Sequence, residues 1–367
     1  MAGNFSYKKF SDINIEDHFF DSLKTDYPGT ANSTGFIEWF KKKSASGSPA
    51  LVFEDESGIQ AFIALKQEEE KIALQDGTIL PPIKRMKIST FRISDKYPRQ
   101  RIGEGAIGLI LWKWQQSHCS EIYVTVFEKH TVLLSLFEKF GFKRCGYNRN
   151  GEIVLSKKRF QIDFSNPYTA FPFIKNNFRH AGYIIIEDTY HDTMFAYSEL
   201  ANNMSLHTKI NSSVSNGLSK IYVGKAPTMR YYIGEPILVY RKYTKGSGKR
   251  YHSCITSYCI VTDIIKAKSN NRYLMSFDDL KGKISNKSVF NEEELFNQYR
   301  TYKNVTVVGM LYYGYFGAKN NVNLDWLDRN GLWASENQYP TEIRLSDVQF
   351  KKVLVEGNIN VSNVIID

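Results

Sequence analysis

The sequence predicts two folds in succession: an α/β fold with a mixed sheet, then a mainly β fold of the α+β class. Strand-like and helix-like runs alternate over residues 1–158, whereas strand-like runs dominate from residue 182 onward. Between them, residues 159–181 lose this periodicity and contain two prolines and many aromatic residues. A length of 367 residues independently favours two domains.

In the first part, hydrophobic periodicity and turn residues define each predicted element. Ser57-Gly58 predicts a hairpin turn, Met86 and Ile88 belong to an alternating strand, and Gly141 ends a helix. The predicted elements are two helices within 14–47, strands 50–55, 59–66 and 85–94, helix 105–117, strand 121–127, helix 131–142 and strand 151–159.

The second part is predicted to be a small β-barrel with peripheral helices. Asn291 followed by Glu294 predicts a capped helix, and Ser346 and Gly357 predict the two ends of another. The first predicted strand begins at residue 182, and further strands cover 219–226, 235–244, 251–265 and 305–316. The predicted helices cover 291–300 and 346–357.

Composition narrows the classes of function. No run of about 18 apolar residues predicts a membrane span, and the N-terminal residues lack a secretory core, so a cytoplasmic protein without a membrane partner is expected. The net charge of +10 suits acidic partners such as nucleotides or RNA. The four cysteines have no metal-ligand spacing, so no metal is expected and reduced, buried thiols are predicted.

The stretch YPRQRIGEGAIGLILWKWQQSH, residues 97–118, joins a predicted strand to a predicted helix. It contains Arg99 and Arg101 and two closely spaced glycines, Gly103 and Gly105. Amides at a helix N-terminus have no intrahelical acceptor and favour anions, and glycine lets the backbone approach a ligand closely. The stretch predicts a phosphate site, with a plain strand-to-helix turn as the alternative.

Three motifs in residues 5–158 resemble the GCN5-related acetyltransferases (GNAT family). They are a strand ending in FRIS before Ile102-Gly103, a helix ending in Phe140-Gly141-Phe142, and the terminal strand EIVLSKK. The resemblance implies a mixed-sheet acetyltransferase fold that uses acetyl-coenzyme A (acetyl-CoA). It also implies amine acetylation by direct transfer.

The phosphate loop of that family reads approximately Arg/Gln-x-x-Gly-x-Gly/Ala. Two registers are possible here. One spans Pro98–Gly103, with Pro98 and Arg101 in place of the usual Arg/Gln and first Gly, and the other places Gln100, Gly103 and Gly105 on the pattern. The resemblance implies that amides in this loop hold the pyrophosphate and that the preceding strand pairs with the pantetheine arm. The implied cofactor-binding residues are Phe91, Arg92, Ile93, Arg99, Gln100, Arg101, Ile102, Gly103, Glu104, Gly105 and Ala106.

Direct transfer needs a base for the amine and an acid for the departing thiolate. In the family, the last helix often supplies a Tyr, but Phe137 stands at that place here and has no proton to give. The predicted catalytic residues are therefore His130, Thr125 and Glu128, and a carboxylate in the run at 68–70 is a further candidate. The structural alternatives are that His130 caps a helix and that the acidic run is solvated.

The second half resembles, more loosely, the PUA-like β-barrels that include the ASCH and EVE domains. The resemblance rests on residues 221–264 and implies RNA or a modified base as partner. Cations that bind phosphates alternate there with aromatic rings that stack on bases, although the tyrosines could equally pack on the barrel. The predicted nucleic-acid residues are Arg241, Lys242, Tyr243, Lys245, Lys249, Arg250 and Tyr251.

We therefore predict a GNAT-like domain at 1–158, a linker at 159–181 and a PUA-like domain at 182–367 that selects the substrate. The alternative is an RNA-binding or modified-base-binding protein with a catalytically weak GNAT-like domain. Phe137 favours this alternative because it has no proton to give. A component that acts on the translation machinery is a third hypothesis, from fold analogy alone. The acceptor and the oligomeric state are left open.

Overall fold

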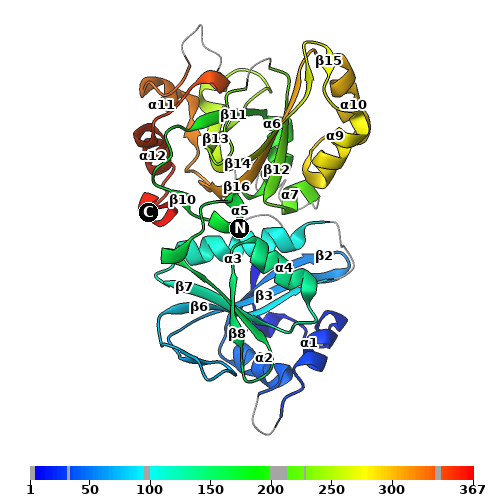
Figure 1. Ribbon diagram of the computed structural model, residues 1–367, viewed down its shortest axis with the longest axis vertical. Helices are drawn as coiled ribbons and strands as arrows, with labels where there is room; N and C mark the ends of the chain where they lie inside the picture. Colours follow the sequence, from blue (N-terminus) through cyan, green and yellow to red (C-terminus); the bar gives the residue numbers. More distant parts are fainter. Residues whose placement is uncertain (1–4, 31–33, 95–99, 199–212, 227–228, 335–339) are drawn as a thin grey trace. The chain divides into compact units, whose positions relative to one another are not determined.

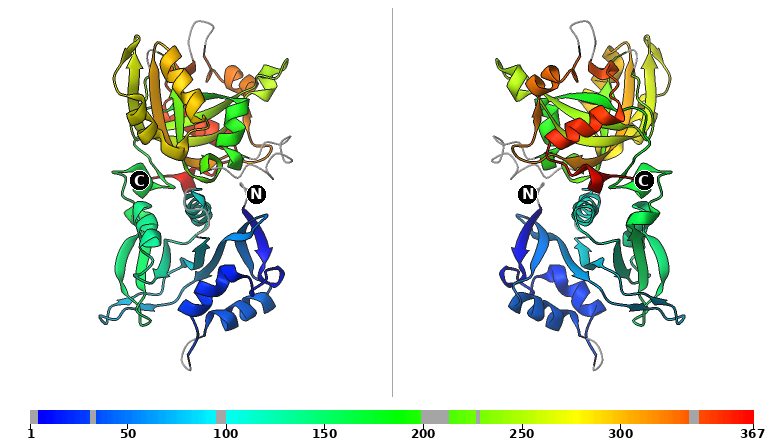
Figure 2. Two further views of the ribbon diagram at one scale, coloured as in Figure 1. Left: turned by 90° about the vertical axis from the view of Figure 1, so that its right-hand side faces the viewer. Right: turned by 90° about the vertical axis from the view of Figure 1, so that its left-hand side faces the viewer.

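The computed structural model describes residues 5–30, 34–94, 100–198, 213–226, 229–334 and 340–367. The chain forms two compact units (Figures 1 and 2). The first unit comprises residues 1–98, 118–137 and 142–160; the second comprises residues 99–117, 138–141 and 161–367. Within the described ranges, no helix has the length and apolarity needed to cross a membrane.

The first unit is built on a seven-stranded mixed sheet with the order β1-β2-β3-β6-β7-β9-β8. Only the central pair β6–β7 is parallel, and the other neighbours in this sheet are antiparallel. The strands are β1 (Phe5–Lys9), β2 (Pro49–Asp55), β3 (Gly58–Glu68), β6 (Arg85–Ile93), β7 (Glu121–Val126), β8 (Lys143–Tyr147) and β9 (Ile153–Lys158). A small hairpin, β4 (Ile72–Ala73) and β5 (Ile79–Leu80), stands apart from this sheet.

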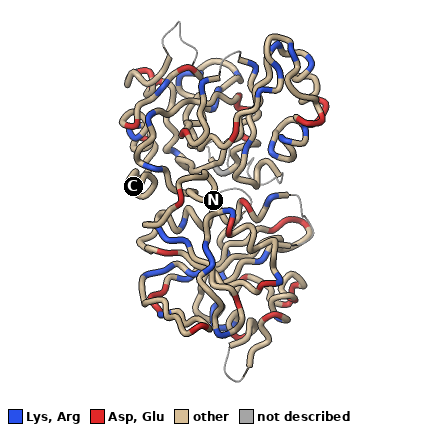
Figure 3. The backbone as a smooth tube through the Cα atoms, in the orientation of Figure 1, with Lys and Arg blue, Asp and Glu red and all other residues tan. Residues whose placement is uncertain are grey.

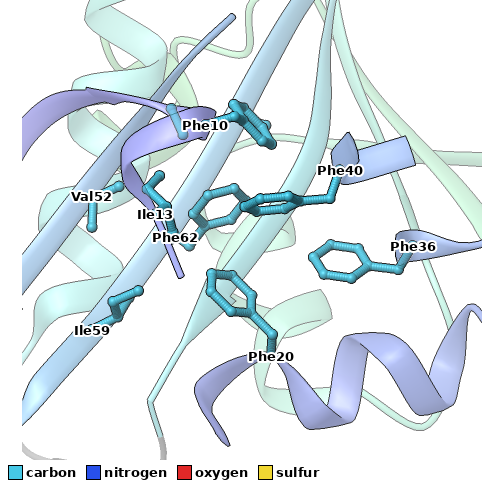
Figure 4. Packing of buried hydrophobic residues seen from close by; sticks show 10 residues of the cluster. Phe10, Ile13, Phe20, Phe36, Phe40, Val52, Ile59 and Phe62 are labelled. Carbon is cyan, nitrogen blue, oxygen red and sulfur yellow. The ribbon is translucent and has the colours of Figure 1, made fainter. Parts of the chain in front are cut away.

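Helices α1 (Asp21–Asp26) and α2 (Phe36–Ala45) pack on one face of this sheet. Aromatic rings dominate that layer, and Phe20 and Phe40 both contact Phe62 of β3 (Figure 4). The neighbouring residue Ile63 is directly opposite Phe91 of β6, so both point to the other face. There Phe91 contacts Phe137 of helix α4 (Thr131–Lys139). The sheet is thus covered by helices on both faces, as the predicted α/β class requires.

The second unit contains a curled sheet (Figure 2) with the order β11-β13-β14-β16-β12, to which β15 and β17 add at β14. Register shifts at four places along the β13–β14 and β14–β16 ladders bend these strands. The strands are β11 (Gly182–Glu187), β12 (Ser219–Gly224), β13 (Pro236–Lys242), β14 (Cys254–Ser269), β15 (Arg272–Tyr273), β16 (Val305–Tyr315) and β17 (Val322–Asn323). A mixed-sheet α/β fold and a mainly β α+β fold are both present, so the predicted fold class is confirmed.

Short helices surround this curled sheet. Leu280 and Leu295, from two of them, pack against Val305 and Val307 of β16. The helices are α5 (Pro167–Ala170), α6 (Asp188–Met194), α7 (Ser213–Asn216), α8 (Lys249–His252), α9 (Phe277–Ile284), α10 (Glu292–Thr301), α11 (Leu324–Arg329), α12 (Asp347–Glu356) and α13 (Val361–Val364). Both predicted caps are present, because Asn291 and Ser346 each form a capping box.

Helix α3 (Ile102–Gln115) groups with the second unit. The Trp112 indole donates to the Tyr313 carbonyl at 2.6 Å and packs edge-on against Tyr312. Trp114, which is fully buried, contacts Phe173. Residues 159–181, predicted as a linker, contain α5 and the strand β10 (Ile174–Lys175), which pairs with β18 (Ile365–Ile366). The predicted domain limits stay a prediction.

Three local features differ from the sequence expectation. Helix α3 begins at Ile102 rather than at Gly105, with Arg101 in the left-handed conformation just before it. The expected strand after Gly182 ends at Glu187 and continues as α6. The edge strands β1 and β8 have no clear alternation in the sequence and were not predicted.

Candidate functional site

The parallel strands β6 and β7 are paired at one end and separate at the other. Their pairing runs from Arg85 opposite Glu121 to Ile88 opposite Val124, although β6 continues to Ile93. A register shift against β3 leaves Ser89 as an extra residue, a β-bulge, where the separation begins. Beyond it, β6 retains β3 on one side and has no strand partner among the described residues on the other. The predicted residues Phe91, Arg92 and Ile93 form this open edge.

At the paired end of the two strands, the charged side chains are buried and pair with opposite charges. Arg85 and Glu121 are each about 2% exposed, and the Arg85 guanidinium donates to the Glu121 carboxylate at 2.9 Å. Glu68, opposite Arg85 in the register, accepts from Tyr123 and forms an ion pair with Lys66. The acidic run 68–70 therefore lies at the paired end, away from the open end where it was considered as a catalytic carboxylate.

Phe137 is fully buried between two other aromatic rings. It lies 5.4 Å from Phe91 and 5.0 Å from Phe142, measured between ring centroids, in edge-to-face contacts. Its role is therefore to hold α4 against β6. The structure places a packing residue where the family resemblance implies a proton donor.

Polar residues from three separate segments meet beside the open end of β7. The Glu152 carboxylate, 4% exposed, accepts from the Tyr27 hydroxyl at 2.7 Å and from the Thr125 hydroxyl at 3.1 Å. Its other oxygen accepts from the Asn148 side chain at 2.7 Å. Burial, then the nearby carboxylates, raise the pKa of the Tyr27 hydroxyl, so this group remains protonated. Sequence reasoning identified Thr125 but missed Glu152 and Tyr27.

The predicted residue His130 lies next to this cluster, at the start of α4. Its carbonyl accepts from the Leu134 amide, which makes it the N-cap, and its ring nitrogen Nε2 is 3.0 Å from Asp26. Burial would raise the pKa of Asp26, but hydrogen bonds from Lys129 and His130 outweigh it and lower that pKa. The exposed Glu128 makes a long contact of 3.4 Å with the Tyr147 hydroxyl.

The N-terminus of α3 presents amides without intrahelical acceptors. The first intrahelical bond is from the Gly105 amide to the Arg101 carbonyl, so the amides of Ile102, Gly103 and Glu104 precede it. The side chain of Arg101, the N-cap residue, makes no capping hydrogen bond to them. This arrangement can accept an anion. Arg99 lies outside the described residues.

The charged side chains of this loop bind within the second unit. Arg101 donates to Glu104 and to the Ser219 carbonyl at 2.7 Å, and Glu104 accepts from the Ser219 amide at 2.8 Å. Burial would raise the pKa of Glu104, but the charges of Arg101 and Lys139 and the Ser219 hydrogen bonds outweigh it and lower that pKa. The Arg101 charge is thus already balanced by Glu104.

The predicted nucleic-acid residues divide into buried and exposed groups. Arg241 is 8% exposed and donates twice to Asp192, at 2.7 and 2.8 Å, in a network with the buried His191. Tyr243 is half-buried against His252. The exposed residues are Lys242, Lys245, Lys249, Arg250 and Tyr251. Lys and Arg occur throughout both units (Figure 3) and are not gathered in one segment.

No family model matches this chain, and no curated protein matches it in sequence. Parts of it resemble solved structures of two kinds, and these are the two kinds that the sequence resemblance names. One kind includes the NatC complex bound to Gag peptide and CoA, at 16% identity over 42% of this chain and 96% of that chain, with a TM-score of 0.28. It also includes a GNAT-family acetyltransferase from Streptococcus agalactiae, at 11% identity over 43% and 98%, with a TM-score of 0.32. The other kind includes ASCH from Zymomonas mobilis, at 10% identity over 48% and 94%, with a TM-score of 0.30.

Proposed function

We propose that this protein is an acetyl-CoA-dependent N-acetyltransferase that transfers the acetyl group directly to an amine. The observation that carries the proposal is the separation of β6 from β7 after Ile88 and Val124, which leaves one side of β6 open. An extended ligand with amide groups, such as pantetheine, can add to such an edge as a further strand. The family resemblance in the sequence points to the same ligand.

Main-chain amides make most of the proposed contacts with acetyl-CoA. Amides along Phe91–Ile93 bind the pantetheine arm, and one of them donates to the acetyl oxygen as negative charge develops there. The amides of Ile102, Gly103 and Glu104 bind the pyrophosphate. Arg101 orients the start of α3 through its bonds to Glu104 and Ser219 rather than by binding phosphate itself. Arg99, Gln100, Gly105 and Ala106 complete the proposed loop.

Proton transfer falls to side chains other than Phe137. Histidine often serves as a general base in enzymes, so His130 is the first proposed residue, and its contact with Asp26 orients the ring. Thr125, at the open end of β7, is the second proposed residue, and Glu128 is the third. The departing thiolate takes its proton from solvent, because Phe137 offers none.

Calorimetry with acetyl-CoA on the full chain tests this proposal. Gly103→Val should weaken binding at least tenfold, because a branched side chain at the second residue of α3 obstructs the approach to the amides. Gly282→Val is the matched control, since Gly282 is also helical and a Cβ there meets no other atom within 4 Å. Absence of wild-type binding at millimolar acetyl-CoA would refute the proposal.

A nucleic-acid-binding function of the second unit is the second candidate. Its support is the exposed run of Lys242, Lys245, Lys249 and Arg250 with Tyr251, which is 62% exposed. RNA binding measured at two salt concentrations should show a negative salt slope that becomes shallower in the double variant Lys245→Ala/Lys249→Ala. An unchanged slope would remove this run from any RNA site. The acetyltransferase proposal and the nucleic-acid-binding proposal are compatible if the second unit selects the acetyl acceptor.

A further inference from the structure

Glu152 is a buried carboxylate whose described partners are all neutral. Tyr27 and Thr125 donate to one oxygen and Asn148 donates to the other. In the part of the chain that the structure describes, no Lys, Arg or His forms an ion pair with it. An ionised carboxylate can accept about four hydrogen bonds, so one acceptor position remains on the oxygen that faces Asn148.

Two other acidic groups of this unit are paired with cations. Glu121, buried to the same degree, is paired with Arg85, and Asp26 is bound by Lys129 and His130. Burying a charge without a counter-charge is costly, so a buried carboxylate held only by neutral donors is a ready site for a cation. Tyr27 and Thr125, which hold one oxygen of this carboxylate, are themselves only partly buried.

We infer that Glu152 binds the ammonium group of a primary amine, and that this amine is the acetyl acceptor. The second part of this inference rests on the proposed function. Glu152 lies next to the open end of β7, because the neighbouring residue Ile153 pairs with Val126. The Tyr27 and Thr125 hydroxyls hold the carboxylate in place, and Tyr27 acts as a positioning residue.

The transfer step removes protons from the amine and replaces the carbon–sulfur bond by a carbon–nitrogen bond. In place of His130 as the base, Glu152 takes one proton from the bound ammonium, and the neutral nitrogen attacks the thioester carbonyl carbon. A carbon–nitrogen bond forms, and the nitrogen then loses its second proton to water. The carbon–sulfur bond breaks, and CoA leaves as a thiolate that takes a proton from water. Glu152 returns its proton to solvent when the amide product departs.

Methylammonium is the probe for the site, and it requires no acetyl transfer. In the full chain at pH 7, 0.2 M methylammonium chloride should raise the Tm by about 2 °C relative to 0.2 M sodium chloride. Glu152→Gln should abolish this difference, and Glu38→Gln, which changes an exposed glutamate on α2, should retain it. A difference that is absent in the wild type, or equal in Glu152→Gln, would overturn the inference.

A second variant covers the case in which Glu152→Gln does not fold. Thr125→Lys places an ammonium in the chain itself, because the Thr125 hydroxyl lies 3.1 Å from Glu152. This variant should lose the response to methylammonium while it remains folded. A retained response would contradict the assignment of Glu152.

Acetyl transfer to methylamine, followed as N-methylacetamide by NMR at saturating acetyl-CoA, separates this inference from the proposed function. Glu152→Gln should lower the transfer rate at least tenfold with an unchanged calorimetric affinity for acetyl-CoA. Equal rates would refute Glu152 and leave the acetyltransferase standing. A methylammonium response without any transfer would support the ammonium site and contradict the proposed enzyme.

Discussion

The two ends of the β6–β7 strand pair differ in almost every physical respect. At the paired end, Arg85 and Glu121 neutralise each other inside the sheet. At the open end, the strands have no mutual hydrogen bonds after Ile88 and Val124, and the nearby buried carboxylate of Glu152 has neutral partners. The first arrangement stabilises the fold, and the second leaves hydrogen-bonding capacity and charge for a ligand.

This contrast shows how one strand pair can be both scaffold and site. A sheet centre is a rigid place from which to hold reactive groups, provided that the pairing ends where the ligand enters. The bulge at Ser89 ends it, because an extra residue changes the direction of β6. Buried charge is balanced where the strands are joined and unbalanced where they part.

The largest expected effect is on stability, at the paired end. Arg85→Met should lower the free energy of unfolding by about 3–5 kcal/mol, because it leaves the Glu121 carboxylate buried without a cation. Urea denaturation of the full chain measures this change.

Glu152→Gln is the matched change at the open end. It should alter the free energy of unfolding by no more than about 1 kcal/mol, because neutral donors already surround this carboxylate. If both variants lose the same stability, the proposed difference between the two ends is wrong.

An intermediate effect is expected at Phe137. Phe137→Tyr places a hydroxyl in a fully buried aromatic contact with Phe91 and Phe142, and should lower the free energy of unfolding by about 1–3 kcal/mol. Urea denaturation gives the loss, and the acetyl-transfer assay shows whether the new hydroxyl contributes a proton. An unchanged stability with faster transfer would mean that this position is catalytic.

A smaller, pH-dependent effect is expected at Asp26. Its pKa is lowered in the folded state, so its contribution is fully present above the unfolded pKa of about 3.9 and is lost as the pH falls through the lower folded value. Asp26→Asn should therefore lower the free energy of unfolding by less than about 1 kcal/mol at pH 7. The two proteins should converge as the pH falls below the folded pKa of Asp26. A difference that persists in acid would show that Asp26 acts through packing rather than charge.

Local sequence signals predicted the elements that local interactions determine. The N-caps of α10 and α12 were predicted at Asn291 and Ser346, and for α10 the partner Glu294 was predicted as well, because it lies only three residues from the cap. The start of α3 was placed three residues late, because Arg101 adopts a left-handed conformation that usually favours glycine. Strand β8 was missed because it is a polar edge strand.

The site depends on contacts that are distant in the sequence. Tyr27 and Glu152 are 125 residues apart, so no spacing rule brings them together. The sequence made a glutamate of the run 68–70 a candidate catalytic carboxylate, but the strand register places Glu68 opposite Arg85 at the paired end. Arg241 was predicted as a nucleic-acid residue from alternation with tyrosines, whereas its partner Asp192 lies on α6, which was predicted as strand. These contacts are determined by strand register and by pairing between distant residues, which the sequence pattern does not reveal.

Hydrogen–deuterium exchange of the full chain with and without acetyl-CoA tests the open edge most directly. We expect slower exchange of amides within residues 89–93 when acetyl-CoA is present, because the pantetheine arm becomes a strand partner. The amides at the paired end, residues 85–88, should be unaffected. Binding of acetyl-CoA with unchanged exchange at 89–93 would contradict the account.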